Sequence, residues 1–211
     1  MTELTTRGRG RQAPAATVQT KQDILNAAAI LFAQKGFDAC SIRDIATQAN
    51  FAHGVIRHHF GSKQNIWMAI AESALEHYKT SLLPFVIEAA QSEEVLQGFK
   101  DLVRSFINET NLQPQLICLM AKEGTIESER SIYFRNEVKL IHKQITPLFE
   151  RAKKECEALE LHTSDSFFLS LFSLTIMPIT MSSITSFIPI GRQTKKQVKL
   201  REELILKMLF E

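Results

Sequence analysis

Hydrophobic residues recur every three or four positions along most of the chain, with polar residues between them. In residues 20–35, for example, Ile24, Ala28 and Leu31 fall on one side of a helix. Ser or Thr precedes several such segments and Gly or Pro follows others, which is typical of helix ends. Because no segment alternates with a period of two, the pattern predicts an all-α protein. The predicted helices are 20–35, 41–48, 52–58, 62–82, 93–108, 114–123, 129–158, 164–187 and 195–210.

Charge is distributed unevenly along the 211 residues. Residues 1–63 contain eight Lys or Arg, only four Asp or Glu, and three of the six His, whereas the remainder is slightly acidic. A basic N-terminal third suggests an anionic partner for that part of the chain. Residues 1–19 offer almost nothing to bury, and we expect them to form a disordered basic tail. Such a tail is either merely solvated or an arm that reaches DNA phosphates or the minor groove.

Metal binding and catalysis find little support in the sequence. The three Cys lie far apart without a CxxC pair, so neither a disulfide framework nor a Cys-rich zinc site is expected. No motif of a hydrolase, a P-loop or a zinc protease occurs. We therefore expect no enzyme activity, no metal and no cofactor. The N-terminal Arg residues precede no apolar segment, so we expect no secretory signal and a cytoplasmic protein.

The stretch GVIRHHFGSK, residues 54–63, concentrates basic side chains between predicted helices. His58 and His59 are adjacent and point apart on a helix, which does not suit a shared metal ion. Two short predicted helices joined by a three-residue turn, the second polar and basic, fit a helix-turn-helix. The spacing leaves two interpretations open, a DNA-reading helix and a capped helical hairpin with a solvated polar face.

Residues 20–66 resemble the DNA-binding domain of TetR-type transcriptional regulators. The matching run is ILNAAAILFAQKGFDACSIRDIATQANFAHGVIRHHFGSK, residues 24–63. The resemblance implies a three-helix helix-turn-helix domain over 20–65, followed by a helical ligand-binding and dimerisation domain over 66–211. Arg57 stands where the family often has Tyr. We expect a transcriptional regulator, most simply a repressor, on double-stranded DNA.

The resemblance also implies roles for individual residues in DNA binding. Ser41 and Arg43 would meet phosphates at the start of the second helix, and Gly54 lets the backbone approach DNA closely. The residues expected to face bases are Ala52, His53, Val55 and Arg57. Those expected to hold the DNA backbone are His58, His59 and Lys63.

The segment 166–190 holds 25 residues without a charge, long enough to span a membrane. Nine of these are Ser or Thr and two are Pro, and the helix after them carries its own apolar stripe. A core helix that also meets a second subunit explains the segment better than a membrane span or a merely buried helix. The resemblance likewise implies a homodimer through 164–187 and 195–210, and hence a near-palindromic operator.

The resemblance further implies a small-molecule pocket in the C-terminal domain. An apolar or amphipathic effector is expected, whose binding would tilt the helix that starts at Ser62 and release the operator. Glu123, Arg104 and His142 are candidates for recognising a polar group. The alternative is a constitutive DNA-binding regulator without an effector, its pocket filled by side chains. The candidate pocket residues are Phe99, Phe106, Met120, Phe134, Phe172 and Met177.

Overall fold

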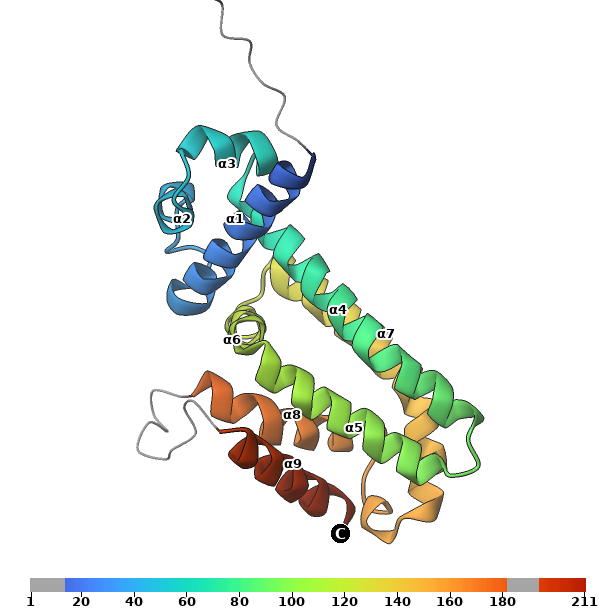
Figure 1. Ribbon diagram of the computed structural model, residues 1–211. Helices are drawn as coiled ribbons and strands as arrows, with labels where there is room; N and C mark the ends of the chain where they lie inside the picture. Colours follow the sequence, from blue (N-terminus) through green and yellow to red (C-terminus); the bar gives the residue numbers. More distant parts are fainter. Residues whose placement is uncertain (1–13, 182–193) are drawn as a thin grey trace, which may run out of the picture. The chain divides into compact units, whose positions relative to one another are not determined.

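The computed structural model describes residues 14–181 and 194–211 (Figure 1). The described residues are helical and contain no strand, so the prediction of an all-α fold is confirmed for them. They divide into two compact units, one ending at Trp67 and the other running from Met68 to Glu211.

The N-terminal unit packs three helices and the start of a fourth around a small core. The helices are α1 (Pro14–Lys35), α2 (Ile42–Ala49), α3 (His53–Phe60) and the first turn of α4 (Lys63–Gln91). Each contributes one apolar face, and the contact between α1 and α2 is the most extensive. The fully buried large side chains at its centre are Ile24, Phe32, Ile45, Ile56, Ile66 and Trp67.

Helix α1 begins earlier than the sequence analysis expected. The predicted tail over 1–19 and the predicted start at Thr20 are wrong for residues 14–19, which are helical. Thr20 lies inside the helix, where its hydroxyl donates to the Ala16 carbonyl at 2.8 Å instead of capping a free end. Pro14 is the first helical residue, where its fixed φ and missing N–H suit a helix start. Residues 1–13 lie outside the described residues.

The described part of the C-terminal unit contains the rest of α4 and five further α-helices. A cluster of four aromatic rings, Phe99, Phe149, Phe167 and Phe210, draws α5, α7, α8 and α9 together, with centroid separations of 5.3–5.9 Å. Offset and edge-on ring pairs at such distances stabilise a core beyond the area they bury. The elements are α5 (Val95–Leu112), α6 (Pro114–Glu123), α7 (Glu129–Ala152), the 3-10 turns η1 (Lys153–Glu155) and η2 (Glu157–Leu159), α8 (Ser164–Thr180) and α9 (Lys195–Phe210).

Helix α4 continues past Pro84, where the sequence analysis expected it to end. Proline removes one helical hydrogen bond and costs about 3 kcal/mol in a helix interior. The turn that follows is nevertheless helical to Gln91, because Ala89 is buried and Phe85 packs against the core. A Cβ on Gly98 of α5 would lie 2.5 Å from the Ala89 Cβ, so the backbones of α4 and α5 are closely apposed here.

Two other predicted helix ends also differ from the structure. The predicted helix 129–158 ends at Ala152 and is followed by two 3-10 turns that bury Leu159. Helix α8 ends at Thr180, while part of the expected interface segment 164–187 and of the uncharged run 166–190 lies outside the described residues. Within the part of the chain that the structure describes, no helix is long and apolar enough to cross a membrane.

Candidate functional site

The α2–turn–α3 element is fixed by local hydrogen bonds that its sequence provides. Ser41 caps α2 by accepting a bond from the Asp44 N–H at 3.1 Å, and Asp44 accepts one from the Ser41 N–H at 2.8 Å. At the other end of α2, Asn50 adopts a left-handed conformation with φ 56° and turns the chain. Phe51 N–H then donates back to the Ala46 carbonyl at 3.0 Å. The turn of residues 50–52 therefore sets the angle between the two helices.

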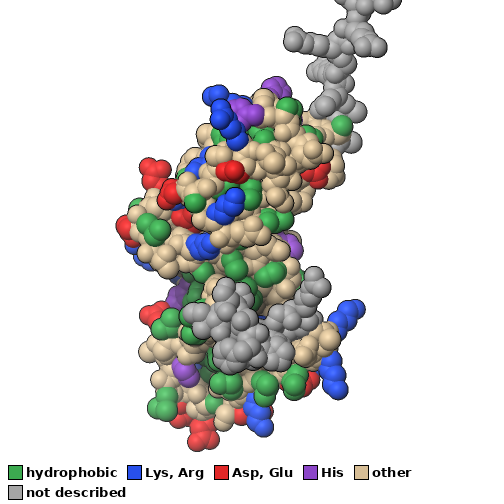
Figure 2. Space-filling view, turned by 90° about the vertical axis from the view of Figure 1, so that its left-hand side faces the viewer, with side chains coloured by type: hydrophobic (Ala, Val, Ile, Leu, Met, Phe, Trp, Pro, Cys, Tyr) green, Lys and Arg blue, Asp and Glu red, His purple; other side chains and the backbone are tan. Residues whose placement is uncertain are grey.

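Helix α3 is anchored by one face and presents the other to solvent. Ile56 is buried in the core, while His53, Gly54 and Arg57 are exposed. A Cβ at Gly54 would meet no atom within 4 Å, so packing within the protein does not require glycine there. Figure 2 shows Lys, Arg and His side chains gathered at the top of the N-terminal unit, the level at which Figure 1 draws α3.

The predicted DNA-binding residues fall into exposed and engaged groups. The exposed group is Ser41, Arg43, Ala52, His53, Gly54, Arg57 and His58, whereas Val55, His59 and Lys63 are half-buried. The Arg43 and Arg57 guanidinium groups have no partner among the described residues, so they are available to an external anion. The Ser41 hydroxyl is already engaged, because it donates to the Asp44 carboxylate at 2.6 Å.

Lys63 has a structural contact that the sequence did not reveal. Its Nζ donates to the Phe37 carbonyl at 2.8 Å and lies 4.1 Å from the centroid of the Phe37 ring. This bond ties the start of α4 to the loop between α1 and α2. Two further N–H groups of the ammonium are left for a phosphate.

Burial shifts the pKa of one of the two adjacent histidines. The pKa of His59 is lowered from its usual 6.5, first by burial and then by the positive charges of His58 and Lys21. His59 is therefore predominantly neutral at pH 7. It can donate one N–H to a phosphate but does not carry a full charge there.

Among the described residues of the C-terminal unit, two small apolar cavities share a wall. The first measures about 60 Å³ and extends between α4, α5, α6, α7 and α8. The second, of about 30 Å³, lies beside it between α4, α5, α7 and α8. Leu82, Phe106, Ile145 and Phe168 line both. The Phe168 and Phe172 rings lie 4.3 Å apart between centroids, and Phe106 packs on Phe172 at 5.6 Å.

The structure brings together four of the six predicted pocket residues. Phe99 lines the second cavity, Met120 and Phe172 line the first, and Phe106 lines both. Phe134 is buried but is not among the residues that line either cavity. The expectation for Met177 is wrong, because its side chain is 55% exposed on the outer face of α8. The hydrophobic pattern of the sequence shows that Met177 belongs to an apolar segment. It does not show whether its side chain faces the core or the surface.

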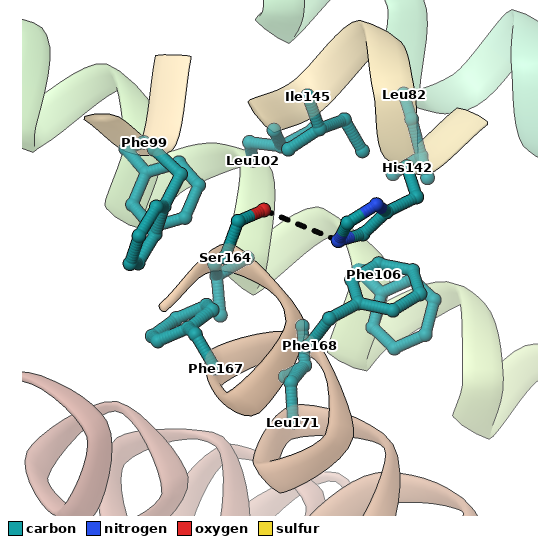
Figure 3. Close-up of a pocket in the computed structure, with 12 residues that line it drawn as sticks. Leu82, Phe99, Leu102, Phe106, His142, Ile145, Ser164, Phe167, Phe168 and Leu171 are labelled. Carbon is teal, nitrogen blue, oxygen red and sulfur yellow. Dashed lines mark hydrogen bonds between the residues drawn. The ribbon is translucent and has the colours of Figure 1, made fainter. Parts of the chain in front are cut away.

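Two polar groups approach the cavities. In the second cavity, His142 Nε2 lies 3.1 Å from the Ser164 hydroxyl (Figure 3). The same hydroxyl lies 2.9 Å from the Thr146 hydroxyl. In the first, Tyr78 is the single lining residue with a hydroxyl group. Neither Tyr78 nor Ser164 was a predicted site residue. The helical spacing of Leu75, Tyr78 and Leu82 on α4 is the signal by which Tyr78 could have been placed on the cavity side.

The other two candidates for recognising a polar group are engaged elsewhere. The Glu123 carboxylate accepts a bond from Arg130 Nε at 2.9 Å, and Arg104 Nε donates to Glu202 at 2.9 Å. Neither residue lines the two cavities. Of the three candidates, only His142 faces a cavity.

Comparison with known sequences agrees with this N-terminal geometry. The family described as "Bacterial regulatory proteins, tetR family" matches residues 24–70. The probable HTH-type transcriptional regulator YttP of Bacillus subtilis is 29% identical over 165 residues, covering 76% of this chain and 77% of that protein. The chain thus carries a DNA-binding domain of the tetR family at residues 24–70. It is accordingly a transcriptional regulator of the TetR type and not an enzyme.

Other TetR relatives match over different extents. The HTH-type transcriptional repressor Rv3405c of Mycobacterium tuberculosis is 39% identical over 72 residues, covering 34% of this chain and 36% of that protein. Two solved structures superpose on most of the chain. AibR in complex with isovaleryl coenzyme A and operator DNA has a TM-score of 0.69 at 17% identity, covering 90% of this chain and 98% of that one. The ketosteroid transcriptional regulator KstR2 of Mycobacterium tuberculosis has a TM-score of 0.70 at 16% identity, covering 90% and 95%. At these identities the likeness shows a shared fold.

Helices α8 and α9 lie side by side (Figure 1), and together they expose several large apolar side chains. We call this surface the α8–α9 face. Its exposed large side chains recur at intervals of four or eight residues, and they are Leu169, Met177, Leu200, Leu204 and Met208. Isolated exposed apolar side chains are common, but a shared face of five on two adjacent helices is typical of an interface.

An arginine holds α9 against α8 at the point where α8 contains a proline. Pro178 has no N–H, so the Leu174 carbonyl loses its helical donor. Arg201 of α9 supplies a replacement, donating to the Leu174 carbonyl at 3.0 Å and to the Thr175 carbonyl at 2.8 Å. The two helices that form the α8–α9 face are therefore fixed to each other by a charged hydrogen-bond donor.

Proposed function

We propose that this regulator is a homodimeric repressor that binds a near-palindromic DNA operator and is released from it by a small apolar or amphipathic effector. The observation that carries the proposal is the exposed basic face of α3, set by the capped α2 and the Asn50 turn. We assign DNA binding to the unit before Met68 and effector binding and dimerisation to the unit after it. Such a protein acts in the cytoplasm, where its DNA is.

In the proposed complex, α3 enters the major groove and its exposed side chains meet the base edges. Arg57 is suited to a bidentate contact with guanine, and Gly54 allows close approach of the backbone. The other residues proposed to face bases are Ala52, His53 and Val55. Those proposed to contact phosphates are Ser41, Arg43, His58, His59 and Lys63. Because the Ser41 hydroxyl is engaged by Asp44, we assign its contact to the backbone N–H groups at the start of α2.

The α8–α9 face supports the proposed dimer. Two copies that pair through this face would bury its five apolar side chains in a four-helix arrangement. A two-fold axis there would relate the two α3 helices. To enter successive major grooves on one side of the DNA, they would have to lie about 34–36 Å apart, which is one turn of the double helix. The operator would then consist of two inverted half-sites.

The cavities support the proposed effector site. Leu75, Tyr78 and Leu82 of α4 line the first cavity, and the same helix begins at Lys63 next to α3. A ligand that displaces these residues would shift α4 and change the spacing of the reading helices. The AibR structure, which contains both isovaleryl coenzyme A and operator DNA, is a precedent for a protein of this fold that binds both kinds of partner.

A constitutive regulator without an effector is the second candidate. The sizes of the cavities, about 60 and 30 Å³, favour it, because ligand pockets usually measure about 300–1,000 Å³. An effector would have to open the core by moving the aromatic side chains between the two cavities. Binding of apolar ligands to the free protein separates the two candidates.

The proposed function is tested by footprinting the purified protein on DNA flanking its own gene. We expect protection of two half-sites one helical turn apart at moderate salt. Addition of an extract of small apolar metabolites should abolish that protection if an effector exists. Protection that no extract changes would support the constitutive alternative, and uniform protection of all DNA would contradict both candidates.

A further inference from the structure

The first cavity has one polar feature that its own protein does not satisfy. Tyr78 is 7% exposed, and its buried hydroxyl has no hydrogen-bond partner among the described residues. A buried hydroxyl without a partner costs about 1–3 kcal/mol, so a phenylalanine would suit an empty core better. The other eleven side chains that line this cavity are Leu75, Leu82, Phe106, Ile117, Met120, Val138, Ile141, Ile145, Phe168, Phe172 and Ile176, all of them apolar.

The hydroxyl is available as a hydrogen-bond donor. Burial raises the pKa of Tyr78, and the nearby charge of Glu109 raises it further, so the group stays protonated at neutral pH. Glu109 itself is engaged by His77 at 2.7 Å. The Tyr78 ring packs 6.3 Å from that of Phe106, whose side chain lines both cavities. The ring that carries the hydroxyl therefore packs on a side chain that a ligand has to move. The hydroxyl itself is buried behind the lining and becomes accessible only when that lining moves.

The lining of both cavities disfavours an anionic ligand. Neither set of lining residues contains a Lys or Arg. The only ionisable group of the second cavity, His142, lies with its Nε2 3.4 Å from the Asp165 carboxylate. A carboxylate or phosphate buried here would lack a permanent positive partner, which is strongly unfavourable in an apolar core.

We propose that the effector is a neutral, largely hydrocarbon molecule with a single carbonyl or hydroxyl oxygen that accepts a hydrogen bond from Tyr78. This inference rests on the effector site of the proposed function and names the chemical class of its ligand. Entry of such a molecule joins the two cavities by displacing the Phe106 and Phe168 rings, so the closed form is the ligand-free one. The hydrocarbon part replaces the contacts that those rings give up.

Three probes of nearly equal shape test the class of ligand on the full-length protein without DNA. They are 2-decanone, nonanoate, in which an anionic oxygen replaces the ketone methyl, and 2-methyl-1-decene, in which a methylene replaces the ketone oxygen. Dissociation constants come from displacement of the neutral dye Nile red. We expect the ketone to bind about tenfold more tightly than either of the other two probes.

Tyr78→Phe removes only the hydroxyl and isolates its contribution. The variant should bind 2-decanone about tenfold more weakly, bind 2-methyl-1-decene as the wild type does, and melt at the same or a higher temperature. Tyr133→Phe is the matched control, because Tyr133 is the other tyrosine of the chain and lines neither cavity. It should bind all probes as the wild type does.

Several results would overturn the inference. The inference is wrong if Tyr78→Phe binds the ketone as tightly as the wild type does. It is also wrong if the wild type binds nonanoate more tightly than the ketone, or does not bind the ketone at all. The comparison of the three probes on the wild type does not depend on any variant. If the ketone bound through Tyr78 but failed to release operator DNA, the ligand class would stand and the regulatory role of the cavity would fall.

Discussion

Lys63 is predicted to contact the DNA backbone, and in the structure it also makes contacts that should stabilise the N-terminal unit. The substitution Lys63→Met tests this stabilising role. Its Nζ donates to the Phe37 carbonyl at 2.8 Å and lies over the Phe37 ring. Methionine keeps most of the apolar stem but removes the ammonium group. The N-terminal unit should therefore lose the tie between α4 and the α1–α2 loop while its core remains packed.

The expected loss is about 1–2 kcal/mol. A hydrogen bond to a charged group contributes about 1.5–3 kcal/mol and a cation–π contact at an exposed site about 0.5–1 kcal/mol. Lys63 is half-exposed, so water competes for both contacts and the sum has to be reduced. The change remains a large fraction of the stability of so small a unit.

Urea denaturation followed by Trp67 fluorescence measures this loss. Trp67 is the only tryptophan of the chain and is fully buried in the N-terminal unit, so its emission reports the unfolding of that unit. The midpoint should fall while the dependence on urea stays unchanged. Lys21→Met, at an exposed lysine of α1, should shift stability by less than about 0.5 kcal/mol. If Lys63→Met behaved like that control, the bond to Phe37 would have no energetic role.

Three further predictions concern DNA binding, assembly and pH. Arg57→Ala should weaken the binding free energy for a specific operator by about 1–3 kcal/mol and change that for unrelated DNA little, as measured by fluorescence anisotropy. Equal losses of affinity for both DNAs would mean that Arg57 contacts a phosphate and not a base. Leu204→Lys should yield monomers in sedimentation experiments, because Leu204 lies on the α8–α9 face, and persistent dimers would exclude that face. The N-terminal unit should lose stability as pH falls through about 6.5, since the lowered pKa of His59 makes the folded state bind protons less readily than the unfolded state.

The last two predictions have matched controls. Leu161→Lys changes a leucine that is 98% exposed outside the α8–α9 face, and it should leave the dimer intact. His59→Gln should flatten the dependence of the Trp67 unfolding midpoint on pH between about 7.5 and 5.5. A decline of unchanged steepness in that variant would mean that another group titrates.

Local signals in the sequence predicted most of the N-terminal unit. The Ser41–Asp44 cap, the Asn50 turn and the apolar spacing around Ile56 each act within a few residues, so they could be recognised from the sequence. The missed start of α1 had a local signal as well, Pro14 at the first helical position. Thr20 was a misleading one, because a threonine inside a helix can bond its own backbone instead of capping an end.

Errors in the C-terminal unit came from contacts between distant segments. Helix α4 passes Pro84 because the following turn packs on the core, which no local rule anticipates. Met177 was expected in a pocket because it is apolar, but whether an apolar side chain faces the core or a partner depends on the neighbouring helices. Tyr78 was missed for the same reason, since its lack of a hydrogen-bond partner appears only once the helices are packed.

The central claim, that α3 reads a specific operator as part of a dimer, is tested most directly by selection from random duplex DNA. The purified protein is incubated with the pool at moderate salt, and the retained duplexes are sequenced. We predict a two-fold symmetric motif whose half-sites are centred about one helical turn apart. Retention without any motif would mean that charge alone drives binding, and it would contradict the account of α3 as a reading helix.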